Sequence, residues 1–297
     1  MISKKPKAGT WIAYLTVPML LYVFTVFFPL LTSLFYSAFE WKGGPHKTFI
    51  GLQNYIQLIH DDVFWLAFRN NLYLVLLCLI GQVGIAFLFV MIINTRFVKL
   101  KGMHRTFGFF PSTISAVAIG FIWMMIYDSR RGLLNWFLTA IGQPEKTQVW
   151  LNNSDLVMTL VAIPLVWQYI GYYMVIIFSA TASIDKEILE CAELDGANAF
   201  QKSIYVVLPM IKNTLAVCVV LCVSGNMKAF DNIYVMTAGG PGNASMVLAM
   251  YGYKISFAQQ NMGYGSAISV GIFILGMLVI GLMMWIQNRI NRKNEVI

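Results

Sequence analysis

The sequence predicts an all-α integral membrane protein whose chain crosses the bilayer six times. Of its 297 residues, 58% are hydrophobic and only 11% are charged, and the mean hydropathy is +0.68. Soluble domains have roughly a quarter of their residues charged, so this chain has too little charge to cover a water-exposed surface. The composition also excludes a disordered chain, a secreted disulfide scaffold and a free nucleic-acid-binding protein.

Six apolar segments are long enough to cross a hydrocarbon core of about 30 Å, which takes roughly 20 helical residues. They are Trp11–Ser37, Leu72–Ile93, Phe107–Tyr127, Leu156–Ala180, Thr214–Val235 and Gly265–Ile286. The first contains Pro18 and Pro29 and has aromatic residues at both ends, which indicates a tilted or kinked helix anchored in both interfaces. A cleaved signal peptide is disfavoured, because its apolar core would be shorter.

The distribution of Lys and Arg predicts the orientation of these spans. Six spans place both termini on one side of the membrane, together with segments 94–106 and 181–213. The four segments on this side hold 13 basic residues in 67 positions, whereas the three opposite segments hold seven in 91. The positive-inside rule therefore predicts that both termini are cytoplasmic. Because the net charge of +8 is scattered among loops, no nucleic-acid partner is expected.

The segment 181–213 differs from a plain topological loop. It holds five of the chain's 13 acidic residues, although acids contribute little to membrane orientation: Asp185, Glu187, Glu190, Glu193 and Asp195. Acids in a helical first turn, an Asp195-Gly196 turn signal and a later apolar spacing of three to four residues predict two short helices joined by a turn. The pattern fits an amphipathic elbow at the membrane surface or a docking surface for another protein.

This segment resembles the EAA loop of the permease subunits of ABC importers. That loop has the pattern E-A-A-x-x-x-G, with a Pro about a dozen residues later. Seven positions match here: Glu190, Ala192, Asp195, Gly196, Ala197, Phe200 and Pro209. The departures are Cys191, where the family usually has Ala, and Asp185, where Pro is common. Both are small changes on a packed face or at a helix start.

Three further stretches extend the resemblance along nearly the whole chain. Residues 49–55 read F-I-G-L-Q-N-Y, similar to the F-x-G-L-x-N-Y signature of carbohydrate permeases, and residues 132–135 (G-L-L-N) resemble the family's external segment after the third span. Phe230-Asp231 with residues 237–241 (T-A-G-G-P) resembles the F-D…T-x-G-G-P run of one of two paired subunits, exemplified by the F protein of the maltose system. The chain therefore resembles the carbohydrate-uptake ABC importer permeases.

The resemblance implies a type I ABC importer permease fold and a set of partners. The seven EAA positions would form a coupling helix docked in a groove of a cytoplasmic ATPase subunit. The chain lacks a G-x-x-x-x-G-K-[ST] phosphate loop, so ATP and Mg would be bound by that ATPase and no cofactor is expected here. Expected partners are a second homologous permease, two ATPase subunits and an extracellular or periplasmic sugar-binding protein, in a bacterial or archaeal plasma membrane.

The resemblance also implies how the chain is divided and what it does. Residues 1–66 would hold the N-terminal tail, the first span and an external loop. Residues 67–287 would form a five-helix permease core with the EAA loop at 184–209, and residues 288–297 a cytoplasmic tail. The expected function is uptake of a sugar, and of an oligosaccharide in particular, by alternating access.

Lys228 and Asp231 are the only charged residues within the six expected spans. A charge at the centre of a membrane helix costs about 2.5–3.5 kcal/mol on insertion scales. At a spacing of three residues the two side chains can pair on one helix face. They predict either a structural ion pair or a water-facing stripe of the translocation cavity. A different class of protein, an ion-coupled secondary transporter using this pair, would be expected to show internal repeats, and none is convincing.

Uncharged polar residues in the spans are the better candidates for sugar contacts. Asn226 offers amide donors and an acceptor without the desolvation cost of a charge. In the fourth span the aliphatic pattern is interrupted by Trp167, Gln168 and Tyr172, where aromatic rings suit the apolar faces of pyranose rings. The family resemblance adds Ser112 and Phe230. Helix packing is the alternative for the residues of the fourth span, and Trp123 is assigned to packing or to the interface.

No cluster of residues predicts catalysis or a metal site. Cys218 and Cys222 share a helix face, but no nearby His or carboxylate would complete a metal site. Asp61 and Asp62, beside His60, fit a solvated external loop or a contact with an external binding protein better than a metal site. We therefore expect a transport subunit and not an enzyme.

Overall fold

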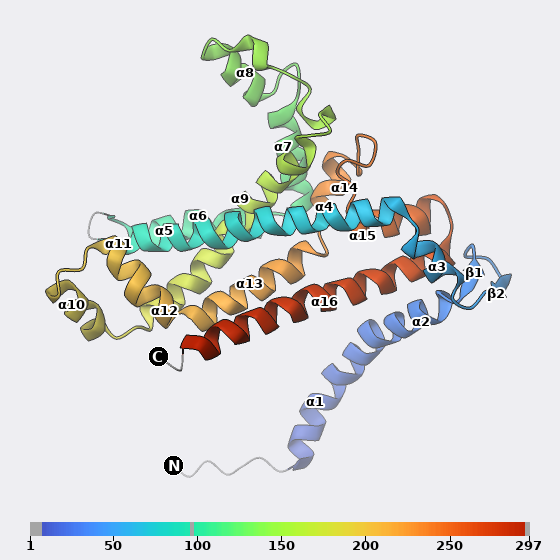
Figure 1. Ribbon diagram of the computed structural model, residues 1–297, viewed down its shortest axis with the longest axis horizontal. Helices are drawn as coiled ribbons and strands as arrows, with labels where there is room; N and C mark the ends of the chain where they lie inside the picture. The colour runs from blue at the N-terminus through green and yellow to red at the C-terminus, as the bar shows by residue number, and fades with distance from the viewer. Residues whose placement is uncertain (1–7, 96–97, 295–297) are drawn as a thin grey trace. The chain divides into compact units, whose positions relative to one another are not determined.

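The computed structural model describes residues 8–95 and 98–294 and is predominantly helical (Figure 1). Its contacts divide these residues into two compact units, one of residues 8–61 and 252–274 and one of residues 62–251 and 275–294, with 96–97 left out. Four helices are long and apolar enough to cross a membrane: Tyr14–Tyr36, Asp62–Asn94, Val157–Ala182 and Met262–Gln287. Two pairs of helices also pass this test together, each pair being bent, so the expected six spans are reached only when each pair counts as one.

The first unit contains the N-terminal span, a small hairpin and part of the last helix. Its elements are α1 (Ala8–Tyr22), α2 (Phe28–Tyr36), β1 (Phe39–Trp41), β2 (Lys47–Phe49), α3 (Gln53–Ile59) and the first part of α16 (Met262–Asn294). A π-helical stretch, Val23–Phe27, joins α1 to α2 just before Pro29, in keeping with the predicted irregular helix.

The hairpin is a departure from the expected all-α fold. β1 and β2 pair antiparallel, with Phe39 opposite Phe49 and their ring centroids 5.4 Å apart. The ammonium of Lys47 lies 5.2 Å from the ring centroid of Tyr36 and 5.4 Å from that of Phe35. Aromatic pairs across strands and cation–π contacts stabilise such a short sheet, which hydropathy along the sequence does not reveal.

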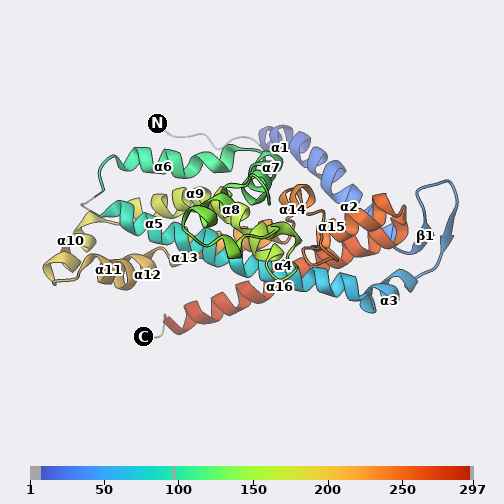
Figure 2. The ribbon, with the colours of Figure 1, turned by 90° about the horizontal axis from the view of Figure 1, so that it is seen from above.

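The second unit is built around the long helix α9 (Val157–Ala182). Its other elements are α4 (Asp62–Cys78), α5 (Ile85–Asn94), α6 (Lys101–Phe109), α7 (Ala116–Tyr127), α8 (Leu133–Ala140), α10 (Lys186–Leu194), α11 (Ala199–Lys202), α12 (Leu208–Met210), α13 (Lys212–Asn226), α14 (Asp231–Met236), α15 (Leu248–Tyr253) and the end of α16. A π-helical stretch, Leu79–Gly84, makes α4 and α5 one continuous helix. Helices α4, α5, α6 and α13 pack against α9 (Figure 2).

Close backbone approach holds α6 against α9. A Cβ atom on Gly171 of α9 would overlap the carbonyl oxygen of Gly108 on α6. Only glycine therefore fits at position 171. Small residues at such contacts are typical of helices that pack within membranes, because they let the two backbones approach closely.

Two of the expected spans are not single helices. The expected third span, 107–127, is broken at Pro111: residues Phe110–Thr113 form a 3₁₀ turn, Ile114 is extended, and the flanking helices are bent by 97°. Proline has no N–H to continue a helical ladder. The expected fifth span, 214–235, is interrupted after Asn226, where α13 ends, and resumes as α14 at Asp231.

Candidate functional site

A cavity of about 230 Å³ lies where α13 ends and α14 begins, within the second unit. It is lined by residues from four segments that are distant in the sequence. The polar and aromatic ones are Gln82, Tyr169, Tyr173, Asn226, Lys228, Phe230, Asp231 and Asn232. Four of the predicted sugar contacts, the residues at positions 226, 228, 230 and 231, are thus brought together at the wall of one cavity.

Two buried amides on α4 support the broken backbone beside this cavity. Asn71 donates from Nδ2 to the carbonyl oxygen of Asn226 at 3.2 Å, and its Oδ1 accepts from the N–H of Leu248 at 2.8 Å. Asn70 donates to the carbonyl oxygen of Met246 at 2.9 Å. An unpaired backbone group in hydrocarbon costs several kcal/mol, so these amides make an interruption of the helix tolerable here.

The side chain of Asn226 is only 5% exposed and belongs to a buried polar cluster. Its Nδ2 donates to the carbonyl oxygen of Cys222 at 2.8 Å and to Oε1 of Gln82 at 3.2 Å. Gln82 in turn donates from Nε2 to the carbonyl oxygen of Leu165 at 3.0 Å. The donors of the Asn226 amide are therefore used within the protein, and Oδ1 is the atom available to accept a hydrogen bond from a ligand.

Lys228 and Asp231 do not form the pair on a helix face that their spacing predicts. Lys228 lies in the turn after α13, whereas Asp231 is the first residue of α14, so no continuous helix carries both. Both side chains are exposed at the cavity, and the structure has no ion pair between them. Of the two predicted arrangements, the structural ion pair is wrong, because the chain breaks between the two residues.

Four of the predicted contacts do not line this cavity: Ser112, Trp167, Gln168 and Tyr172. Gln168 is buried and donates from Nε2 to the carbonyl oxygen of Ile114 at 3.0 Å, so its amide bridges α9 to the break before α7. The ring of Trp167 lies edge-on to that of Trp123, with centroids 6.2 Å apart. Trp167, Gln168 and Tyr172 lie on an adjacent face of α9, and Ser112 lies in the 3₁₀ turn before α7. Their contacts with a sugar stay predictions.

Four polar or aromatic residues that line the cavity are not among the predicted contacts: Gln82, Tyr169, Tyr173 and Asn232. A spacing of four residues places Leu165, Tyr169 and Tyr173 on one helix face, which was a usable signal. Gln82 is the one amide within the expected second span, and a buried amide in a membrane helix is itself a functional indicator.

The acidic segment forms the two short helices that its sequence predicts. The N–H of Glu187 donates to the side chain of Asp185 at 3.2 Å, which starts α10. Asn198 and Gln201 form a reciprocal capping box at the start of α11. Between the helices Gly196 has φ +82°, a left-handed conformation that favours glycine. The predicted turn at this position is confirmed.

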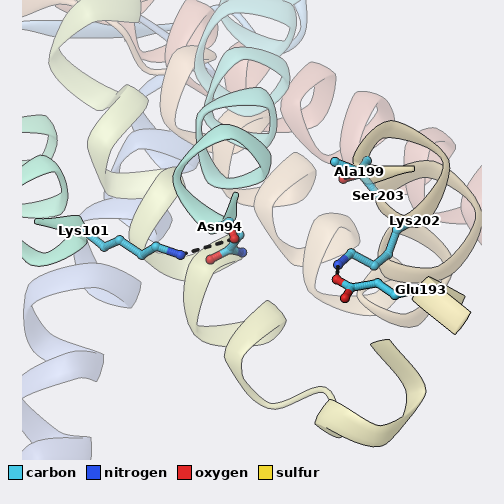
Figure 3. A network of polar contacts seen from close by, with 6 residues as sticks. All are labelled: Asn94, Lys101, Glu193, Ala199, Lys202 and Ser203. Carbon is cyan, nitrogen blue, oxygen red and sulfur yellow. Dashed lines mark hydrogen bonds and ion pairs between the residues drawn. The ribbon is translucent and has the colours of Figure 1, made fainter. Parts of the chain in front are cut away.

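Polar contacts link these helices to one another (Figure 3). The ammonium of Lys202 donates to the carboxylate of Glu193, which joins α11 to α10. The hydroxyl of Ser203 donates to the carbonyl oxygen of Ala199 at 2.7 Å. Two of the five acids, Asp185 and Glu193, are therefore used internally, while Glu190 remains exposed.

The same segment exposes large apolar side chains. Leu194 is 87% exposed, Phe200 71% and Tyr205 75%. Such residues on short polar helices are typical of a surface that another protein covers. Phe200 is one of the seven EAA positions, and its exposure leaves it available for a partner.

The asparagines of the sequence signatures have structural roles. Asn54 is buried and donates to the carbonyl oxygen of Ser37 at 2.8 Å, which attaches α3 to the end of α2. Asn135 is buried and donates to the carbonyl oxygen of Gln148 at 3.0 Å, and its Oδ1 accepts from Nε1 of Trp150 at 2.7 Å. These two signatures therefore stabilise loops.

Two acidic residues outside the spans are held by neighbours. The backbone N–H groups of Arg131 and Arg130 donate to the carboxylate of Asp128, and these hydrogen bonds lower the pKa of Asp128 below its ordinary value. The hydroxyl of Tyr264 donates to the carboxylate of Asp61. Asp61 is half-buried, and the expected contact of this loop with a binding protein stays a prediction.

Comparison with known proteins places the chain in a family. Residues 84–295 match the family described as "binding-protein-dependent transport system inner membrane component". The chain is 36% identical to the probable ABC transporter permease protein YurN of Bacillus subtilis, over 87% of this chain and 89% of that protein. It is 28% identical to the diacetylchitobiose uptake system permease protein NgcF of Streptomyces coelicolor, over 96% of this chain and 84% of that protein.

The fold is shared with a solved structure. A bacterial alginate ABC transporter, in complex with a periplasmic protein that carries an alginate pentasaccharide, contains a chain that superposes with a TM-score of 0.83. The match covers 95% of each chain at 20% sequence identity. The chain therefore belongs to the family of binding-protein-dependent transport system inner membrane components and is a multi-pass permease subunit of an ABC transporter, not an enzyme.

Proposed function

We propose that this chain is one of two permease subunits of an ATP-driven importer that takes up an oligosaccharide delivered by a binding protein. The observation that carries the proposal is a cavity of amide, carboxylate, ammonium and aromatic groups where the expected fifth span is interrupted between α13 and α14. Similarity to a permease named for diacetylchitobiose uptake, and to the fold of an alginate importer, supports a carbohydrate substrate.

The groups at this cavity suit a sugar. Hydroxyls can donate to Oδ1 of Asn226 and to the carboxylate of Asp231, and they can accept from the ammonium of Lys228. The ring of Phe230 stacks on Tyr234, with centroids 5.2 Å apart, which holds an aromatic face at the cavity wall. The residues of α9 contribute Tyr169 as a further ring with a hydroxyl.

The size of the cavity supports alternating access. A volume of about 230 Å³ is below the roughly 300–1,000 Å³ of ordinary ligand sites. It is too small for a whole oligosaccharide, so the walls must separate to pass one. The break between α13 and α14 provides a place where the backbone can change direction during such a movement.

The short helices α10 and α11 are proposed to transmit this movement from the ATPase subunits. The docked surface comprises Glu190, Ala192, Asp195, Gly196, Ala197, Phe200 and Pro209. A carboxylate at Glu190 can pair with an Arg of the ATPase, and the exposed Phe200 can fill an apolar groove. ATP and Mg are bound by the two ATPase subunits, in which the hydrolysis takes place.

We propose that residues 107–127 and residues 214–235 each make one crossing despite their breaks, which gives six spans, cytoplasmic termini and a plasma-membrane location in a bacterium or archaeon. The domain limits proposed from the sequence, 1–66, 67–287 and 288–297, follow from the same arrangement. An ion-coupled transporter using Lys228 and Asp231 is not favoured, because Lys228 lies in the turn after α13 and Asp231 begins α14, with no ion pair between them.

The experiment that tests the function uses the complete assembly. Both permeases and the ATPase are co-purified and reconstituted, and ATPase activity is measured with the binding protein and a panel of maltose, cellobiose, diacetylchitobiose and alginate oligosaccharides. We expect one sugar class to stimulate hydrolysis and to enter the vesicles only with ATP. Uptake driven by a proton gradient in vesicles without ATPase subunits would contradict the proposal.

A further inference from the structure

A second cavity, of about 690 Å³, lies in the second unit at the connection between α5 and α6. It shares no lining residue with the cavity at the break after α13. Its apolar part is formed by Phe89, Ile92, Ile93 and Met174, and its polar part by Lys99 and His104. We propose that this cavity binds an anionic phospholipid, with an acyl chain against the apolar residues and the phosphate at Lys99 and His104.

The location of this cavity along the chain places it at a membrane–water boundary. Helix α4 continues through α5 as the candidate span Asp62–Asn94, and the cavity is formed by the last turns of that span and the residues that follow it. This position holds whichever side of the membrane the connection faces. Ile92 and Leu100 at the cavity are exposed, so lipid has access to them.

The ionisable residues around the cavity are all basic. Residues 98–109 contain Lys99, Lys101, His104 and Arg105 and no Asp or Glu, and α9, which packs against α6, contains no charged residue. No acid on these elements therefore competes with a phosphate for the basic groups. Basic clusters at membrane boundaries attract anionic lipids by about 1 kcal/mol for each Lys or Arg.

The other two basic residues of this stretch are committed to contacts inside the protein. The ammonium of Lys101 donates to the carbonyl oxygen of Asn94 at 3.2 Å and so caps the end of α5 (Figure 3). The guanidinium of Arg105 lies 3.4 Å from the ring centroid of Phe178. Lys99 is exposed and lines the cavity, which makes it the residue that meets the headgroup.

A phospholipid fits these features better than a soluble anion. A free phosphate or nucleotide would meet Lys99 and His104 but would leave the apolar walls formed by α5 and α9 uncovered. Burial of a lipid chain against the apolar walls is favourable for each CH₂ group, and the headgroup adds the electrostatic attraction. The two parts of the cavity therefore select an amphiphile with a negative charge.

The test uses the complete importer in lipid nanodiscs and does not depend on transport. A photoactivatable phosphatidylglycerol is incorporated at low fraction in phosphatidylcholine, and its crosslinks to this chain are mapped by mass spectrometry. We expect crosslinks within residues 89–108. Unlabelled phosphatidylglycerol should compete with them, whereas additional phosphatidylcholine and inorganic phosphate should not.

Two variants separate the two parts of the site. Lys99→Gln should lower the apparent affinity for phosphatidylglycerol about five-fold, as expected from the loss of one basic residue near the headgroup. Ile92→Trp fills the apolar part without changing charge and should lower the crosslinking yield. Lys146→Gln removes an ammonium that is also exposed, in the 3₁₀ turn Pro144–Lys146, and should leave the crosslinks unchanged.

Several results would overturn the proposal. Equal competition by phosphatidylcholine would make the cavity a groove for any lipid, and competition by inorganic phosphate would make it a soluble anion site. Crosslinking that is unchanged in both Lys99→Gln and Ile92→Trp would place the lipid elsewhere. If both variants fail to assemble and the wild type gives no phosphatidylglycerol crosslink, the cavity is instead a contact with another subunit. A failure of sugar uptake alone would leave the lipid result standing.

Discussion

The hydroxyl of Tyr127 donates a hydrogen bond to the carbonyl oxygen of Leu160 at a distance of 3.1 Å. In a regular helix that carbonyl would accept the N–H of the residue four positions later, and this residue is Pro164, inside α9. The side chain of α7 therefore supplies the hydrogen bond that α9 lacks. Both partners are buried, so the contact also ties α7 to the central helix of the second unit.

We expect Tyr127→Phe to lower the free energy of unfolding by about 1 kcal/mol, because a buried carbonyl loses its donor. The measurement is thermal or denaturant unfolding of the purified chain in detergent. Combining the substitution with Pro164→Ala restores the N–H, so the double variant should lose little more than Pro164→Ala alone. Strictly additive losses would show that Tyr127 does not serve the carbonyl left by Pro164.

Asn232 is a buried polar residue without hydrogen bonds. Its side chain is 2% exposed, and neither amide atom has a hydrogen-bond partner. A buried amide without partners costs about 1–3 kcal/mol. We expect Asn232→Leu to be neutral or stabilising in the same unfolding assay. Asn71→Leu is the matched control and should be destabilising, because the Asn71 amide makes hydrogen bonds in both directions. Strong destabilisation by Asn232→Leu would mean that its amide is paired in the folded protein.

Gly196 tests the coupling segment. It has φ +82°, and a Cβ at this position would meet open space, so its substitution acts through backbone strain alone. We expect Gly196→Val to reduce sugar-stimulated ATPase activity and uptake at least about ten-fold, a loss of roughly 1.4 kcal/mol in coupling, while membrane insertion is retained. Gly142→Val imposes the same strain at φ +77° in a loop outside this segment and should keep activity. Equal losses in both variants would contradict a docking role for α10 and α11.

Lys228 and Asp231 allow a double-mutant cycle on transport rate. Because Lys228 lies in the turn after α13 and Asp231 begins α14, without an ion pair between them, Lys228→Met and Asp231→Asn should have additive effects within about 0.5 kcal/mol. The assay is uptake by the reconstituted importer. Recovery of activity in the double variant would demonstrate the structural pair that the spacing predicts.

The cysteines provide a test of orientation in the unmodified chain. Cys191 on α10 is exposed, whereas Cys78, Cys218 and Cys222 are buried. A membrane-impermeant maleimide should therefore label one site, and only in inside-out vesicles that lack the ATPase subunits. Cys191→Ala should abolish the labelling. Labelling of intact right-side-out cells would reverse the proposed topology.

Much of this protein could be predicted because the relevant information is local. Hydropathy marked the apolar segments, and four of them are long helices in the structure. The Asp195-Gly196 signal predicted a turn because a left-handed backbone at one residue depends on that residue's own side chain. The hairpin at 39–49 was not predicted. Each of its strands has only three residues, too few to show an alternating pattern, and the hairpin depends on aromatic contacts between the strands.

The sequence by itself determined that the chain is a membrane permease and identified which short segments carry polar groups, because composition and motif spacing are properties of the linear chain. Only the tertiary structure decided which polar residues meet. The cavity uses Tyr169 and Tyr173 in place of Trp167, Gln168 and Tyr172, because the packing of α9 fixes which of its faces is turned toward α13. The tertiary structure also separates Lys228 from Asp231. Asn71 binds a carbonyl group at the end of α13, and Asn70 binds one in the segment that follows α14; both asparagines are more than 150 residues away in the sequence. Hydrogen bonds over such distances in the sequence leave no periodic trace in it.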